Sequence, residues 1–227
     1  MKNYNIAIDG PAGAGKSTIA KSVAKKLGYI YVDTGAMYRA MGLYMLKQNI
    51  LIDDEVAVSK ACNQVVITIE YIDREQQVVL NGENVTGLIR TEEAGKLASA
   101  VARYNQVRTK MVELQKKLAA ISNVIMDGRD IGTVVLPNAD LKIYLTASSE
   151  ERALRRWKEL QSKGISNDIN EIEEDIIKRD HQDMNREISP LRQAEDAVLI
   201  DSSDLTIDEV IDKIILLFKE KRSGDLL

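Results

Sequence analysis

Apolar positions along the chain follow two periods, and the order in which these periods occur predicts an α/β fold. A short apolar run at 6–8 is typical of a buried strand, and Ser17–Leu27 carries apolar residues at helical spacing before Gly28, a natural helix stop. Further strands are expected at Tyr29–Val32, Val65–Ile72, Gln77–Leu80, Asn123–Met126, Leu141–Leu145 and Val198–Asp201. Further helices are expected at Ala36–Gln48, Thr91–Arg103, Val107–Ile121, Ser149–Lys163, Asp168–Arg186 and Ile207–Lys219.

Residues 53–92 depart from this alternation of strands and helices. Two strand-like segments, Val65–Ile72 and Gln77–Leu80, are separated only by the polar segment Asp73–Gln76, and Asn81-Gly82 follows the second. Short strands joined by tight polar turns favour antiparallel pairing over another β-α unit. We therefore expect a small antiparallel insert on a β-α core. In the later helix Val107–Ile121, the expected apolar stripe consists of Met111, Leu114, Leu118 and Ile121.

Composition narrows the function classes. The 227 residues are 44% hydrophobic, enough for a proper core, and the net charge of −4 argues against nucleic acid as the main partner. Cys62 is the only cysteine, which excludes an internal disulfide framework and favours buried packing. His181 is the only histidine, so the chain lacks the histidines that a histidine-rich metal site needs. No uncharged run approaches about eighteen residues, and a soluble intracellular protein is expected.

The most specific motif is Gly10–Ser17, G-P-A-G-A-G-K-S, which satisfies the spacing G-x-x-x-x-G-K-[ST]. It lies between the apolar run at 6–8 and the first helix pattern, as a phosphate-binding loop requires. Backbone N–H groups and the positive end of the helix would then hold a polyphosphate, and Lys16 would reach its β- and γ-phosphates. A glycine-rich turn without a ligand is the alternative. The fixed residues and both flanks favour a nucleoside triphosphate with Mg²⁺.

Polar segments elsewhere are expected at the same edge of the sheet. Asp33–Arg39 and Asp127–Asp130 both directly follow a predicted strand, and the carboxyl ends of parallel strands share one edge. These segments should therefore lie beside the phosphate loop.

The helix Asp168–Arg186 changes character along one face. Its inward stripe begins with Ile169, Ile172 and Ile176, and the same direction continues with charged residues, Arg179, Asp183 and Arg186. A solvated helix end carrying an ordinary surface ion pair would also explain these charges. Because guanidinium groups bind phosphate and carboxylate through paired hydrogen bonds, and the phosphate loop already requires an anionic ligand, a binding cleft is favoured.

Four motifs occur in order along the chain: Asp9–Ser17, D-G-P-A-G-A-G-K-S; Asp33–Arg39, D-T-G-A-M-Y-R; Asp127–Val135, D-G-R-D-I-G-T-V-V; and Arg179–Arg186, R-D-x-x-D-x-N-R. In order and separation they resemble bacterial cytidylate kinase, a family of nucleoside monophosphate kinases. The resemblance covers the chain from end to end. It implies a monomeric cytoplasmic enzyme that transfers a phosphoryl group from ATP to CMP or dCMP. These small-molecule substrates leave no role for nucleic acid or a membrane.

The resemblance also implies a domain organisation. The fold is a three-layer α/β/α P-loop kinase core with a five-stranded parallel sheet, a small insert with antiparallel strands that binds the nucleoside monophosphate (NMP), and a short helical lid. The core is expected at residues 1–35, 104–151 and 165–227, the NMP-binding domain at 36–103, and the lid at 152–164.

The family's monophosphate contacts can be transferred residue by residue. They fall on Thr34, Arg39, Ser99, Arg108, Arg129, Asp130, Arg179, Asp183 and Arg186. Cytosine offers an amino donor at C4 and acceptors at N3 and O2, so a carboxylate and two donors suit it: Asp130, Arg108 and Ser99. Ser99 lies among alanines, and from the sequence alone it is typical of helix packing.

The remaining acceptor contacts resemble the family's phosphate and pentose contacts. Arg39, Arg129 and Arg186 look like holders of the acceptor phosphate. Arg179 and Asp183 resemble the pentose-binding pair.

The donor ATP is assigned to the loop and the lid. The expected contacts are Gly10, Pro11, Ala12, Gly13, Ala14, Gly15, Lys16, Ser17 and Thr18. Lys16 and Arg129 are the expected catalytic cations, together with lid arginines taken from Arg152, Arg155 and Arg156, of which the last two are the main candidates. A solvated helix face is the alternative for the lid arginines.

Ser17 is the expected Mg²⁺ ligand. Some relatives have glycine at this position, which leaves Thr18 or a bound water as the alternative. Some relatives also carry arginine where this chain has Gln182.

Three other functions fit part of the sequence. A phosphate-loop switch protein would need an N-K-x-D segment to bind guanine, and the chain has none. The other two are a kinase for another small molecule and a non-catalytic ATP-binding module that uses the insert as a docking surface.

Overall fold

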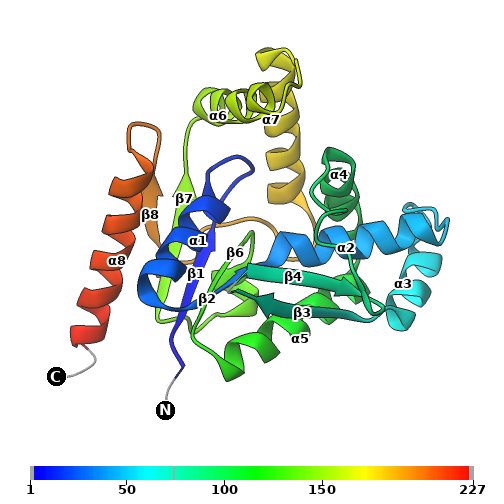
Figure 1. Cartoon of the computed structure of the whole chain (residues 1–227), viewed down its shortest axis with the longest axis horizontal. Coiled ribbons are helices and arrows are strands. Elements are labelled where there is room, and N and C mark those ends of the chain that lie inside the picture. Colours follow the sequence, from blue (N-terminus) through cyan, green and yellow to red (C-terminus); the bar gives the residue numbers. More distant parts are fainter. Residues whose placement is uncertain (1–2, 74, 225–227) are drawn as a thin grey trace.

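A computed structural model describes residues 3–73 and 75–224. Its centre is a five-stranded parallel sheet with the strand order β2-β6-β1-β7-β8 (Figure 1). The strands are β1 (Asn5–Asp9), β2 (Ile30–Asp33), β6 (Val124–Gly128), β7 (Leu141–Thr146) and β8 (Val198–Asp201). The α/β fold with a five-stranded parallel sheet is therefore confirmed.

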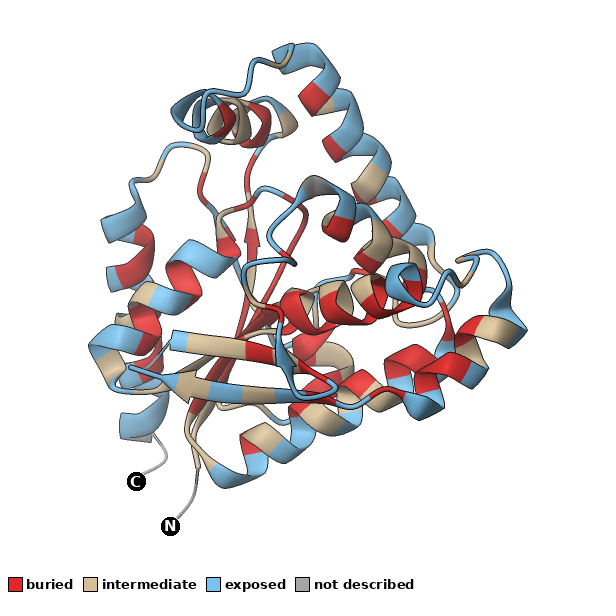
Figure 2. Ribbon diagram, turned by 45° about the vertical axis from the view of Figure 1, so that its right-hand side comes forward, coloured by how far each residue is buried: buried red, intermediate tan, exposed pale blue. Residues whose placement is uncertain are grey.

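Side chains alternate between the two faces of the sheet, and each face has its own hydrophobic core. Ile6 and Ile8 belong to one cluster and Ala7 to the other, as the two-residue period of a strand dictates. Helices α1 (Lys16–Leu27) and α8 (Ile207–Gly224) cover the first face. Helices α2 (Thr34–Lys47) and α5 (Asn105–Ile121) cover the second, so the buried positions form continuous bands between sheet and helices (Figure 2).

The insert is an antiparallel sheet, as predicted, and it has a third strand that was not predicted. Its strands are β3 (Ile67–Ile72), β4 (Glu75–Leu80) and β5 (Glu83–Asn84). β4 begins two residues before its predicted start, and residue 74 of the predicted turn lies outside the described part of the chain, as do residues 1–2 and 225–227 of the predicted core.

The insert contacts the outer edge of β2 through side chains. The Gln76 carboxamide accepts the Asp33 N–H at 2.8 Å and donates to the Asp33 carbonyl at 3.2 Å. The Tyr71 hydroxyl donates to the Tyr31 carbonyl at 3.1 Å. Polar side chains of the insert thus form hydrogen bonds with backbone groups of an edge strand.

Three elements were absent from the sequence predictions, among them the short strand β5. Helix α3 (Glu55–Gln64) precedes the insert and begins after Asp54, whose side chain accepts the N–H of Ala57. A short π-helix, η1 (Ile131–Val135), follows β6. Two apolar stripes are also shorter than expected: Ile121, the last residue of one, is 76% exposed, and Ile169, the first residue of the other, is 36% exposed.

The helices α6 (Ser149–Ser162) and α7 (Ile169–Asn185) pack against each other beyond the carboxyl edge of the sheet, at the top of Figure 1. Ala153, Leu160, Ile172 and Ile176 form a small core of their own, with Trp157 beside it. Helix α4 (Glu92–Val101) packs on α2. Among the helices described, none has the length and apolar character needed to span a bilayer.

Candidate active site

The phosphate loop joins β1 to α1 in a conformation that depends on glycine. An ideal Cβ on Gly10 would lie 1.9 Å from the Leu145 carbonyl oxygen, so no side chain fits there. Gly15, the N-cap residue of α1, has a φ of 83°, in the left-handed region that glycine adopts without strain. The loop can therefore turn tightly and present its N–H groups beside the first turn of α1.

Lys16 is buried at the start of α1. Its ammonium donates to the Pro11 carbonyl at 2.6 Å, across the loop. Burial, together with the guanidinium of Arg129, lowers the pKa of Lys16 well below its ordinary value. An anion bound at this loop would oppose that effect and favour the charged ammonium.

Asp127, the fourth residue of β6, accepts hydrogen bonds from two hydroxyl groups. The Ser17 hydroxyl donates to its carboxylate at 2.7 Å, and the Tyr31 hydroxyl donates at 2.9 Å. Burial and the nearby charge of Asp33 raise the pKa of Asp127 to about 6. A carboxylate held beside the loop hydroxyl in this way can ligate a hard cation. The predicted metal ligand Ser17 therefore has a partner that was not predicted.

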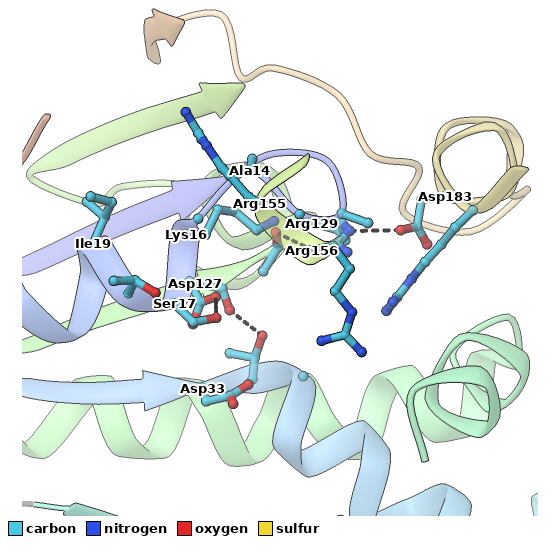
Figure 3. Close-up of a pocket in the computed structure, with 18 of the residues that line it drawn as sticks. Ala14, Lys16, Ser17, Ile19, Asp33, Asp127, Arg129, Arg155, Arg156 and Asp183 are labelled. Carbon is cyan, nitrogen blue, oxygen red and sulfur yellow. Dashed lines mark hydrogen bonds and ion pairs between the residues drawn. The ribbon is translucent and has the colours of Figure 1, made fainter. Parts of the chain in front are cut away.

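A cavity of about 710 Å³ opens between the phosphate loop, helices α2 and α4, and helices α6 and α7. Residues 12–18 of the loop line it, whereas Gly10 and Pro11 do not. Every predicted acceptor contact lines it as well: Thr34, Arg39, Ser99, Arg108, Arg129, Asp130, Arg179, Asp183 and Arg186. Lys16, Asp127 and Arg129 lie around the same space in Figure 3, and Asp183 reaches Arg129 from α7.

Ion pairs order the cationic side of this cavity. The Arg129 Nε donates to Asp183 at 2.8 Å. Arg186 lies 3.7 Å from Asp130 and 3.8 Å from Asp183. Asp130 also forms a buried ion pair with Arg108. Segments after β6, on α5 and on α7 are thus joined around one space.

Arginine side chains outnumber carboxylates among the acceptor contacts, and their charges shift the pKa values of neighbouring groups. Burial and the charge of Arg129 lower the pKa of Arg179 to about 10. Although burial opposes the effect, the guanidinium of Arg129 lowers the pKa of Asp183, which stays ionised. Within the described residues, buried guanidinium nitrogens of Arg39, Arg179 and Arg186 have no hydrogen-bond partner. Such donors are what an anionic ligand would satisfy.

Arg39 is held at the first turn of α2. Asp33 accepts the N–H of Ala36 at 2.8 Å and pairs with Arg39 at 2.7 Å. The Thr34 hydroxyl donates to the Asp127 carbonyl at 2.6 Å. The motif Asp33–Arg39 therefore joins the start of α2 to the end of β6.

The three arginines expected in the lid lie on α6 and do not play equivalent roles, and one expectation is corrected. Arg155 and Arg156 line the cavity, where Arg155 donates to the Ser202 carbonyl at 2.6 Å and Arg156 donates to Glu159 at 2.8 Å. Arg152 is buried, lies outside the cavity lining, and pairs with Asp180. It also donates to the Ala12 carbonyl at 2.8 Å and so holds the phosphate loop from outside the cavity.

Part of the cavity lining was not predicted. Leu205, Thr206, Ile207 and Val210 form one wall after β8, next to Ser202. The segment between β8 and α8 and the first turn of α8 contribute only a few apolar residues here, which is no distinctive sequence signal. Asp127, by contrast, lies one residue before the end of β6, a strand paired in parallel with β1, and that position was a detectable signal for a loop partner.

Other chemistry has little support in the part of the chain described. Cys62 is buried and free, as expected for a packing residue. No group of three or more histidine, cysteine, aspartate or glutamate side chains there is arranged to hold a metal ion.

Comparison with known proteins agrees with the four motifs. The family model for cytidylate kinase matches residues 6–220. The chain belongs to the cytidylate kinase family. It is 54% identical to a cytidylate kinase of Caldicellulosiruptor bescii over 218 residues, covering 96% of each chain. It is 51% identical to one of Desulfitobacterium hafniense over 220 residues, covering 97% of this chain and 94% of the relative.

Solved structures support the fold of this cytidylate kinase family member. A gluconokinase of Sinorhizobium meliloti superposes with a TM-score of 0.51 at 11% identity, covering 96% of this chain and 92% of the other. A protein of Eubacterium ventriosum gives a TM-score of 0.53 at 12% identity. At such identities the likeness concerns the fold alone.

Proposed function

We infer that the chain is an ATP-dependent nucleoside monophosphate kinase that transfers the γ-phosphoryl group of ATP to CMP or dCMP, giving ADP and CDP or dCDP. The observation that carries this inference is one cavity lined both by the phosphate loop and by acceptor residues of the three other motifs. Phosphoryl transfer needs donor and acceptor phosphates side by side in a cationic space. Membership of the cytidylate kinase family supplies the identity of the acceptor.

On the donor side, we assign the ATP phosphates to the backbone N–H groups of residues 12–18 and to Lys16. The apolar wall of Leu205, Ile207 and Val210 suits the base end of the nucleotide. Ser17 and Asp127, joined at 2.7 Å, fit a Mg²⁺ ion because both present oxygen ligands beside the loop. When bound, Mg²⁺ would neutralise charge on the β- and γ-phosphates.

On the acceptor side, we assign the CMP phosphate to Arg39, Arg129 and Arg186. The support is the unsatisfied buried donors of Arg39 and Arg186, because a phosphate accepts several charge-assisted hydrogen bonds. Arg179 and Asp183 are the proposed pentose contacts. Arg179 Nε is a further buried donor without a partner among the described residues.

Base selection is assigned to Asp130, Arg108 and Ser99. Arg108 and Asp130 form a buried pair, so a donor and an acceptor face the base together. The cytosine amino group would donate to Asp130, whereas uracil presents an acceptor at that position. Two acceptors facing each other in a buried site are strongly unfavourable, and such mismatches can cost about 10⁴-fold in discrimination.

The chemistry assigns no strong base to the protein. The CMP phosphate oxygen is already nucleophilic, so the residues contribute alignment and charge neutralisation. We assign Lys16 and Arg129 to the phosphoryl group in transfer, and Arg155 and Arg156 would join them when the lid, proposed as residues 152–164, closes. Closure would also exclude water from the reacting phosphoryl group.

The test is a set of initial rates of ADP formation with CMP, dCMP, UMP, AMP and no acceptor. CMP and dCMP should give the highest kcat/KM, and the reaction without acceptor should be slow. Equal rates with all acceptors, or turnover that does not depend on CMP, would reject the proposal. ATP binding without any CMP-dependent turnover would favour a non-catalytic ATP-binding module, and turnover only with a different acceptor would favour a kinase for another small molecule.

A further inference from the structure

Asp9, the last residue of β1, binds two successive backbone N–H groups through a buried carboxylate. One oxygen accepts the N–H of Ile131 at 2.7 Å, and the other accepts the N–H of Gly132 at 2.7 Å. Asp9 is 4% exposed. Burial raises its pKa to about 6, and the two N–H groups oppose that rise. An ionised carboxylate only accepts hydrogen bonds, so this pairing suits both partners.

These two hydrogen bonds fix the segment that contains Asp130. In the parallel pairing of β1 with β6, Asp9 is the partner of Gly128. The backbone pairing of Asp9 therefore holds the chain just before Arg129, and its side chain holds the chain just after Asp130. Both residues between these attachment points line the proposed acceptor site.

The surroundings leave Asp9 and its partners little freedom. Gly10, the next residue, packs so closely on the Leu145 carbonyl that it excludes any side chain. On the other side, an ideal Cβ on Gly132 would lie 3.3 Å from the Asp9 carboxylate and 3.1 Å from the Lys142 side chain. The carboxylate is thus enclosed between the start of the phosphate loop and the segment that follows Asp130.

We propose that Asp9 is a positioning residue for acceptor selection: by fixing residues 129–132 it sets the place of Asp130 against the acceptor base. This inference rests on the proposed function. Asp9 does not line the cavity. It acts on Asp130 through the backbone of residues 131 and 132. If residues 129–132 shifted, Asp130 would lose its alignment with a cytosine amino group while the protein stayed folded.

The decisive variant is Asp9→Asn, which keeps the shape but offers one accepting oxygen instead of two. Its amide group would face one of the two N–H donors. We expect kcat/KM for CMP to fall about tenfold to a hundredfold, mostly through KM, and the CMP/UMP preference to fall with it. KM for ATP should stay within about threefold of wild type, because the phosphate loop keeps its own contacts.

Asp140→Asn is the matched control. The Asp140 carboxylate accepts the N–H of Asn5 at 2.8 Å, at the opposite end of β1 and away from the cavity. This variant should leave the CMP/UMP ratio unchanged. A double-mutant cycle then identifies the route: with Asp130→Ala already present, Asp9→Asn should change the CMP/UMP ratio by less than about twofold.

Two results would overturn the inference. One is an unchanged CMP/UMP ratio in folded Asp9→Asn, and the other is a loss confined to ATP binding, which would place the role of Asp9 in the phosphate loop. If Asp9→Asn does not fold, Gly132→Ala, which crowds the same carboxylate, decides in the same assay. A wild-type enzyme without CMP preference would instead reject the proposed function.

Discussion

Replacing Asp180 by alanine removes a buried carboxylate that ties α7 to the phosphate loop and to α6. One oxygen accepts the Ala12 N–H at 3.0 Å, and the other pairs with Arg152. Both side chains are at most a tenth exposed, so solvent screens the pair weakly. We expect Asp180→Ala to destabilise the fold and to weaken ATP binding together.

The magnitude follows from the groups left behind. Removing one partner of a buried ion pair costs about 3–5 kcal/mol, because the other charge stays buried. The Ala12 N–H would also lose its acceptor, for about 1–3 kcal/mol. Arg152 keeps the carbonyls of Ala12 and Ala147 as partners, which offsets part of the total. The free energy of unfolding should therefore fall by about 3–5 kcal/mol.

Urea denaturation followed by circular dichroism measures this change. Asp175→Ala, at an exposed position on the same helix, is the control and should stay within about 0.5 kcal/mol of wild type. Replacing both partners, Arg152→Met with Asp180→Leu, should recover much of the loss. A fall below about 1 kcal/mol in Asp180→Ala would refute the assignment of this pair as a structural junction.

Four further changes test the site. Lys16→Ala should abolish CMP-dependent ADP formation while circular dichroism stays native; retained turnover would contradict the donor assignment. Asp130→Ala should reduce the ratio of kcat/KM for CMP to that for UMP more than tenfold, with a smaller effect on the Kd for ATP, and an unchanged ratio would reject its base-reading role. Arg179→Met should raise KM for CMP at least tenfold; wild-type kinetics would mean that this arginine makes no contact with CMP. Asp127→Asn should raise the free energy of unfolding above pH 6 by up to about 3 kcal/mol, because the folded-state pKa of Asp127 is raised from 3.8 to about 6 and its ionisation opposes folding. This gain should disappear as the pH falls towards 4. If urea denaturation gives the same difference in the free energy of unfolding at every pH, the ionisation of Asp127 does not oppose folding.

Much of the candidate site could be predicted because it depends on local rules. The loop needs glycine at fixed spacings, and the acids after β2 and β6 share an edge because the strands are parallel. Arg179, Asp183 and Arg186 follow from helical periodicity, and all three line the cavity. These inferences needed no knowledge of how distant helices pack.

Features that depend on distant packing could not be predicted. Arg152, Arg155 and Arg156 lie within about one and a half helical turns and look alike in the sequence. Only the packing of α6 against α7 brings Asp180 to Arg152 and leaves the other two in the cavity. Asp9 is a comparable case, since its partners lie 122 and 123 residues away.

The side chains of Gln76 and Tyr71 have a consequence for solubility. β2 is an outermost strand of the parallel sheet, and an open strand edge is a template for pairing with another chain. The carboxamide of Gln76 imitates a neighbouring peptide group, and the Tyr71 hydroxyl occupies a further carbonyl. The insert thereby blocks intermolecular β-pairing at this edge, so a shortened chain lacking it would be prone to aggregate even where its core still folds.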